Sequence, residues 1–176
     1  DELSPVSLTW STARSPRSFM NTVQPVTFEM TMHALGEIAC RRIGKILKDR
    51  DIPVADVAYE YVDASATPYD EKFTVRAVVN ADDAREALMV ITEVMASLDG
   101  AGTSVNEYRT ARSRYLDHLR DISAEPLKSN DECVDRCISA FMYNSSSGSH
   151  KEKLKYHESR NLPDTTQLRL FNDMAK

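Results

Sequence analysis

The chain has 176 residues, of which 41% are hydrophobic and 28% charged, the composition of an ordinary globular domain large enough to bury its own core. Its formal net charge of −5 disfavours a nucleic-acid partner or an acidic membrane surface, because both require a basic face. No apolar run approaches the roughly 18 residues of a membrane-spanning helix. We therefore expect no nucleic acid and no membrane among its partners.

The first predicted element is a strand. In VSLTWST (6–12), the apolar residues Val6, Leu8 and Trp10 alternate with polar ones. Such alternation is typical of a half-buried strand, because successive side chains point to opposite faces. We expect these three side chains to face the core.

A long helix is predicted next, after a proline-containing linker. It begins near 25–27 and runs to about Lys48, because its apolar residues recur at helical spacing. Gly36 and Gly44 each cost about 1 kcal/mol relative to alanine within a helix, so we expect another backbone to approach closely at these positions. The expected core stripe consists of Phe28, Met32, Leu35, Ala39, Ile43, Ile46 and Leu47.

A hairpin follows the helix. The segments VADVAYEYVDAS (54–65) and FTVRAVVNA (73–81) are rich in β-branched and aromatic residues and are predicted strands. Pro68 and Asp70 lie in the short polar connection between them and favour a turn. A connection this short predicts antiparallel pairing.

Two more helices are predicted after the hairpin. The segment DDAREALMVITEVMASL (82–98) is amphipathic, and its acidic start suits the positive end of the helix dipole. The segment 103–122 follows a glycine-containing break. There Ser104 and Glu107 have the spacing of a capping box, which predicts a helix start.

The last third of the chain is predicted to be helical with one flexible loop. DECVDRCISAFMYN (131–144) is a predicted helix, SSSGS (145–149) a loop, and HKEKLKYHESRN (150–161) a short surface helix. LPDTTQLRLFNDMAK (162–176) is a final helix with Asp164 or Thr165 as cap. The side chains expected to face inward are Val134, Ile138, Phe141, Met142, Leu168, Phe171 and Met174.

One helical stripe carries potential metal ligands. His33, Glu37 and Cys40 follow at spacings of four and three, which places an imidazole, a carboxylate and a thiol on one helical face. A zinc site requires three protein ligands and a water, or four ligands, and no fourth ligand is evident. The favoured interpretation is therefore the polar border of a packing helix, and metal binding by these three residues stays the open alternative.

The other histidines and the cysteines give no site. His118, His150 and His157 lie in strongly charged segments, so we expect them on solvated helix faces. Three cysteines form no disulfide framework. Cys133 and Cys137 are four apart on a predicted helix, where they are expected to be small buried hydrophobes.

No catalytic residue is predicted. Arg41, Arg42 and the run RTARSR (109–114) are either an anion-binding patch or, as we favour, a solvated face beside acids. The chain contains no glycine-rich phosphate loop, no Gly-x-Ser-x-Gly elbow and no His-Glu-x-x-His helix. We therefore expect no nucleophile, general base or metal ligand here, and the substrate-binding residues stay unknown.

The order of the segments resembles a known family. The helix LGEIACRRIGKIL precedes the hairpin VAYEYVDASATPYDEKFTVRAVV, then NADDAREALMVITEV and TSVNEYRTARSRYLDHL, with KSNDECVDRCISAFMYN and LPDTTQLRLFNDMAK closing the chain. This order is similar to the non-catalytic, C-terminal-type subdomain of the pitrilysin/insulinase family of inverted-motif, processing-peptidase-like zinc metallopeptidases. The resemblance covers about residues 6–176, and the order carries it rather than any single motif.

The resemblance implies an α+β fold, with an antiparallel sheet and helices packed on one face. Several such subdomains form a clamshell around unfolded peptide substrates, and the family holds its zinc with a His-x-x-Glu-His motif. This chain lacks that motif: the nearest segment, His33-Ala-Leu-Gly-Glu37, has the wrong spacing and no second histidine. We therefore expect no cofactor in this segment and zinc in the parent chain.

The expected function follows from that resemblance. Residues 1–176 are expected to be one non-catalytic subdomain, excised from a longer zinc metalloendopeptidase. Its expected partners are the other subdomains of the parent chain and the peptide substrate, in the bacterial periplasm or otherwise exported. The alternatives are an inactive scaffold protein of the same fold and an unrelated ferredoxin-like binding module.

Overall fold

The structure is a computed structural model that describes residues 3–13, 17–20, 22–62, 70–124, 134–135, 137–138, 141–142, 149–160 and 164–175. Its strands are β1 (Leu3–Ala13), β2 (Val54–Val62) and β3 (Asp70–Asn80). Its helices are α1 (Arg17–Met20), α2 (Gln24–Asp49), α3 (Ala84–Ala101), α4 (Val105–Ala124), α6 (His150–Ser159) and α7 (Asp164–Met174), with a 3-10 turn at Ala81–Asp83.

The three strands form one antiparallel sheet in the order β1-β3-β2. The hairpin prediction is confirmed, and β1 adds to the far side of β3, where Val6 is opposite Ala77 and Leu8 is opposite Val75. Both β1 side chains pack against the core as predicted. The prediction for Trp10 holds only in part: its ring lies 5.9 Å from that of Phe73 between centroids, but 39% of the residue is exposed.

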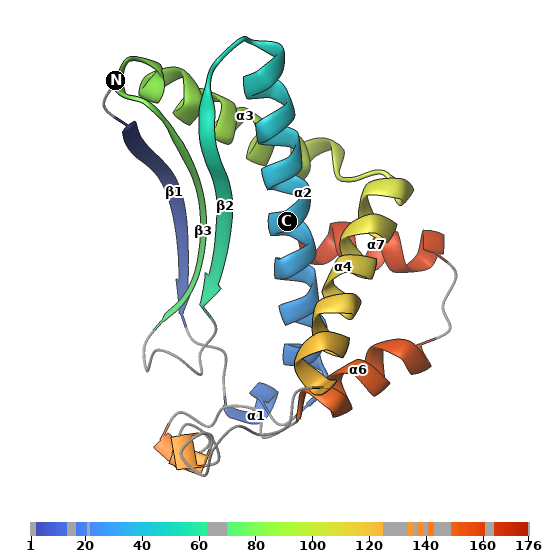
Figure 1. The fold of residues 1–176 in the computed structure, drawn as a ribbon. Helices are drawn as coiled ribbons and strands as arrows, with labels where there is room; N and C mark the ends of the chain where they lie inside the picture. The colour runs from blue at the N-terminus through green and yellow to red at the C-terminus, as the bar shows by residue number, and fades with distance from the viewer. Residues whose placement is uncertain are drawn as a thin grey trace.

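Helices α2 and α3 cover one face of the sheet, and α4, α6 and α7 lie on the far side of α2 (Figure 1). The predicted α+β fold with helices on one face is thereby confirmed. The opposite face of the sheet carries polar side chains such as Thr74 and Arg76, and none of the described helices covers it. None of the described helices is both long and apolar enough to cross a bilayer.

Helix α2 is the centre of the domain, because it is covered on two sides. Four of its predicted core residues are buried against the sheet and α3: Leu35, Ala39, Ile43 and Leu47. Met30, Thr31, Ala34 and Ile38, which the predicted stripe omitted, are also buried, since α2 packs against α4 as well as against the sheet. Burial on two sides places the N-terminal half of α2 beneath the helical layer that holds the candidate site.

The expectation for the two glycines of α2 is corrected. At Gly36 the close neighbour is a side chain: a Cβ there would lie 2.2 Å from Cδ2 of Tyr59. At Gly44 no atom lies within 4 Å of the position of a Cβ. Gly36 is therefore the position where the flat ring of Tyr59 rests directly on the helix backbone.

The capping box at the start of α4 is confirmed. The backbone N–H of Ser104 donates to Oε2 of Glu107 at 2.9 Å, and the backbone N–H of Glu107 donates to Oγ of Ser104 at 3.3 Å. The preceding helix runs past its predicted end at residue 98 and stops at Gly102, whose φ of 71° lies in the left-handed region that favours glycine. The short connection brings α4 back against α2.

The C-terminal predictions are confirmed in part. In α7, Phe171 is buried and Leu168 packs against the core, as predicted. In 131–144, the described residues are helical, but the four side chains expected in the core are exposed: Val134 (53%), Ile138 (50%), Phe141 (86%) and Met142 (56%). That prediction was wrong, because none of the described helices covers this apolar stripe. Residues 63–65, Pro68, Cys133 and 145–148 lie outside the described residues.

Candidate functional site

The structure engages His33 in an aromatic cluster. Its ring lies 5.4 Å from the ring of Tyr115, 5.9 Å from that of Tyr59 and 6.1 Å from that of Tyr61, measured between centroids. Its Nδ1 lies 3.3 Å from the hydroxyl of Tyr59. These contacts bind α2 to β2 and α4 and give His33 a packing role.

Glu37 and Cys40 have other partners too. Glu37 accepts hydrogen bonds from Arg41, at 3.1 Å, and from Arg114 of α4. Burial, and after it the charges of Glu37 and Asp56, raise the pKa of the Cys40 thiol to about 12, so the thiolate that metals bind is disfavoured. In the described part of the chain, no three His, Cys, Asp or Glu side chains come together around a possible metal position. These residues do not fit a zinc ion.

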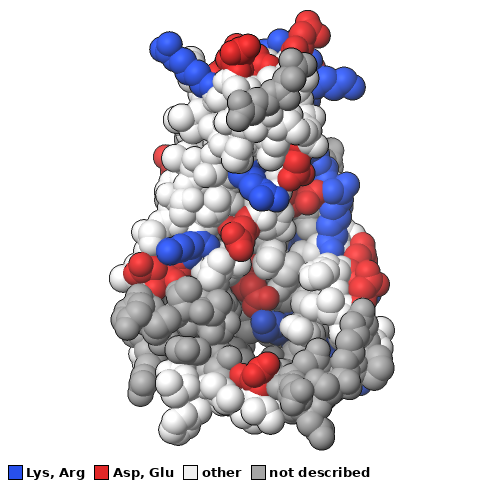
Figure 2. Space-filling model, turned by 60° about the vertical axis from the view of Figure 1, so that its left-hand side comes forward, with Lys and Arg blue, Asp and Glu red and all other residues white. Residues whose placement is uncertain are grey.

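The favoured interpretation of the arginines, a solvated face beside acids, is confirmed for Arg41, Arg109 and Arg114, which are exposed and pair with carboxylates. Arg112 is partly buried and donates to a backbone carbonyl instead. Arg42 of α2 donates to both oxygens of Glu107 at 2.8 and 2.9 Å, and Arg109 of α4 donates to Asp164 of α7 at 2.6 Å. The hydrogen bonds from Arg42 hold the pKa of Glu107 at about 2. Basic and acidic side chains are also interspersed over the face shown in Figure 2, with no field of one sign.

The predicted positions of His118 and His150 are confirmed, since both are exposed, but that of His157 was wrong. Only 2% of His157 is exposed, because α6 lies on α4 and the His157 ring packs against Tyr115 and Tyr156 at 5.7 and 5.2 Å. Cys137 was expected to be buried and is exposed.

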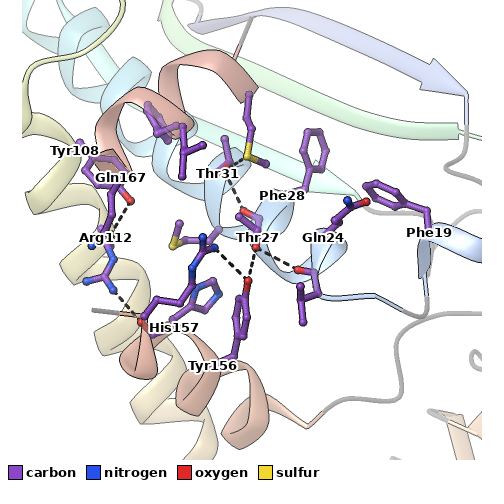
Figure 3. Close-up of a pocket in the computed structure, with 16 residues that line it drawn as sticks. Phe19, Gln24, Thr27, Phe28, Thr31, Tyr108, Arg112, Tyr156, His157 and Gln167 are labelled. Carbon is purple, nitrogen blue, oxygen red and sulfur yellow. Dashed lines mark hydrogen bonds between the residues drawn. The ribbon is translucent and has the colours of Figure 1, made fainter. Parts of the chain in front are cut away.

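A pocket of about 540 Å³ lies beside His157, between the first turns of α2 and helices α1, α4, α6 and α7 (Figure 3). One part of its wall is apolar: Phe19, Phe28, Met30, Leu170, Phe171 and Met174. Another part is polar: Thr27, Tyr108, Arg112, Tyr156, Arg160 and Gln167. This is the candidate functional site, and sequence reasoning missed it because its walls come from five separate helices.

A hydrogen-bond network holds the polar wall in place. The hydroxyls of Thr27 and Tyr156 lie 3.1 Å apart, and Nη1 of Arg160 donates to the hydroxyl of Tyr156 at 3.1 Å. On the other side, Nη2 of Arg112 donates to the backbone carbonyl of His157 at 3.0 Å (Figure 3). The network ties α4 and α6 to the start of α2, so these polar groups are preorganised.

His157 adds an unsatisfied polar atom to this wall. Its Nε2 is buried and has no hydrogen-bond partner among the described residues. Burial, followed by the positive charges of Arg112 and Arg160, lowers the pKa of His157 to about 4, while a hydrogen bond with the Val26 backbone acts in the opposite direction. The ring is therefore neutral at physiological pH.

The site is a cationic, partly apolar pocket in an α+β domain with helices on one face of its sheet. The same fold occurs in solved proteases. The first half of the periplasmic protease PqqL from Escherichia coli matches with a TM-score of 0.69 at 13% identity, over 99% of this chain and 37% of that one. A predicted insulinase family protease from Yersinia pestis matches with a TM-score of 0.67 at 12% identity, over 97% of this chain and 37% of that one.

A third similar structure is that of a mutant of the ferredoxin protease FusC in complex with Arabidopsis ferredoxin, with a TM-score of 0.60 at 10% identity, over 98% of this chain and 17% of that one. The chain therefore has a pitrilysin/insulinase-like fold and spans well under half of each of these proteases. No protein-family model and no curated protein matches the sequence.

Proposed function

We propose that the chain is a non-catalytic subdomain of a zinc-dependent metallopeptidase and helps to build the wall of a clamshell chamber in which peptides or unfolded proteins are hydrolysed. The observation that carries the proposal is the match of nearly the whole chain to a part of larger protease chains. The chain also lacks a His-x-x-Glu-His motif. In this proposal zinc belongs to another part of the parent chain, and the other subdomains are the partners.

The exported compartment is part of the same proposal. Two of the similar structures are of a protease described as periplasmic, which supports a bacterial periplasmic or otherwise exported parent. The ferredoxin-like alternative loses support, because the matches extend over 97–100% of the chain and so include the closing helices α6 and α7.

An inactive scaffold of the same fold stays the second candidate. The exposed apolar stripe Val134, Ile138, Phe141 and Met142 favours a protein that holds partners, since contiguous exposed apolar side chains mark interaction surfaces. The parent gene separates the two candidates: a His-x-x-Glu-His motif in another subdomain supports the enzyme, and its absence supports the scaffold.

Peptidase assays of the purified chain, first alone and then added to a parent protein that lacks it, test the proposal directly. The purified chain alone is expected neither to cleave a quenched fluorescent peptide nor to retain stoichiometric zinc, measured by plasma mass spectrometry with His33→Ala as a comparison. Adding the chain to a parent protein that lacks it is expected to restore cleavage. Robust cleavage by the chain alone, or one zinc per chain lost in His33→Ala, would overturn the proposal.

A further inference from the structure

Two guanidinium groups, those of Arg112 and Arg160, line the pocket beside His157, and neither pairs with a carboxylate of the described residues. Within the described part of the chain, Arg112 and Arg160 donate only to neutral oxygens, the His157 carbonyl and the Tyr156 hydroxyl, and no acidic residue lines the pocket. The positive charges of both arginines reach His157 and Tyr108: burial lowers the pKa of His157 and the two charges add to that shift, whereas burial raises the pKa of Tyr108 and the two charges oppose that rise. An anion would be stabilised at this end, because guanidinium groups bind carboxylates through charge-assisted hydrogen bonds.

The same end of the pocket offers one hydrogen-bond acceptor. Nε2 of His157 has no partner among the described residues. The ring also forms a hydrogen bond with the Val26 backbone, which we assign to the other ring nitrogen, Nδ1. A neutral imidazole that donates from Nδ1 to a carbonyl presents a lone pair at Nε2. A buried acceptor left unsatisfied is destabilising, so a ligand with a well-placed N–H or O–H gains by binding here.

The remainder of the wall selects an apolar group. Met30, Leu170, Phe171 and Met174 line it, and methionine side chains adapt to ligands of different shape. The volume of about 540 Å³ lies within the range of about 300–1,000 Å³ that is usual for small-ligand sites. The ligand must therefore combine a negative charge, a nearby hydrogen-bond donor and an apolar side chain.

We propose that this pocket binds the C-terminal residue of a peptide that ends in an apolar amino acid. The terminal carboxylate pairs with Arg112 and Arg160, and the last peptide N–H donates to Nε2 of His157. The apolar side chain packs against Phe171 and Met174. A fatty acid has the carboxylate but lacks the N–H, and inorganic phosphate lacks the apolar group. The inference concerns binding by this pocket and does not depend on the function proposed above.

Calorimetric titration of the purified chain with three matched probes tests the chemistry. The probes are an N-acetylated tripeptide ending in leucine, its C-terminal amide, and the free acid methylated at the last peptide nitrogen. The free acid is expected to bind saturably, the amide about tenfold more weakly and the N-methyl acid at least about threefold more weakly, from the usual strengths of charged and neutral hydrogen bonds.

A pair of variants tests the location. Arg160→Gln is expected to weaken binding of the free acid about tenfold and to leave binding of the amide unchanged. Arg85→Gln makes the same substitution at an exposed position of α3, outside the pocket, and is the matched control that is expected to change neither. Circular dichroism of both variants is the control that checks that they are folded.

The same titration with octanoate tests a fatty acid against the peptide acid. Three results would overturn the proposal: no saturable binding of the free acid up to about 1 mM, the weak end of measurable affinities; equal affinities for the acid and the amide; or octanoate binding as tightly as the peptide acid. Equal loss in Arg160→Gln and Arg85→Gln would overturn it as well, since the site would then lie elsewhere.

Discussion

Substituting Gly36 by alanine tests how closely β2 and α2 are packed. The added Cβ would lie 2.2 Å from Cδ2 and 2.3 Å from Cγ of Tyr59, whereas non-bonded carbons rest about 3.5–4.0 Å apart, so the ring would have to retreat by more than about 1 Å. It has little freedom to do so, because it packs against Phe73 at 6.4 Å between centroids and its hydroxyl lies 3.3 Å from His33.

The expected change in the free energy of unfolding of Gly36→Ala is the sum of two opposing effects. Overpacking a core costs about 1–3 kcal/mol, and an overlap of this size places Gly36→Ala at the upper end. The higher helix propensity of alanine offsets about 1 kcal/mol of this cost. We expect the free energy of unfolding to fall by about 2 kcal/mol, measured by urea denaturation followed by far-ultraviolet circular dichroism.

Gly44→Ala is the control within the same helix. No atom lies within 4 Å of its Cβ position, so this variant is expected to be more stable than the wild type by about 0.5–1 kcal/mol. In a Tyr59→Ala background the loss at Gly36 is expected to disappear, because the two substitutions are coupled through one contact. If Gly36→Ala proves as stable as Gly44→Ala, the reasoning about the ring contact is wrong.

The remaining predictions concern titratable groups. The pKa of Glu107 is about 2 instead of 4.5, so the free energy of unfolding is expected to fall as the pH drops through this interval, and urea titrations should show a smaller fall in Arg42→Gln. Burial lowers the pKa of His157 from 6.5 to about 4. As the pH falls from 6.5 towards 4, the unfolded chain protonates this histidine before the folded chain does, so the free energy of unfolding is expected to decline. His157→Gln should flatten this part of the plot of unfolding free energy against pH. Cys40, with a pKa raised to about 12, is expected to react with iodoacetamide far more slowly at neutral pH than exposed Cys137; equal rates by mass spectrometry would contradict this.

Features that depend on neighbours in the sequence were predictable. The alternation of Phe73, Val75 and Ala77 places one face of β3 in the core, and the structure buries all three. The Ser104–Glu107 capping box is likewise formed by residues three apart, so its spacing alone predicts the start of α4.

Features that depend on which helices meet were not predictable. The charged segment around His157 has the composition of a surface helix, yet α6 turns this one histidine onto Tyr115 of α4. Val134 and Phe141 have the spacing of core residues, but no described helix covers them. A single helix indicates which of its faces is apolar, and it carries no information about whether a partner lies against that face.

The strand order has a consequence for folding. Strand β1 pairs along its whole length with β3, so that Leu3 lies opposite Asn80, although β2 is closer to it in sequence. Until β3 is synthesised, neither β1 nor β2 has a partner strand, because β3 is the central strand of the sheet. Pairings between such distant segments slow folding, because the entropy of closing the intervening loop is lost before the contacts form. A nascent chain that ends before β3 therefore presents the unpaired edges of β1 and β2 to chaperones and to other chains.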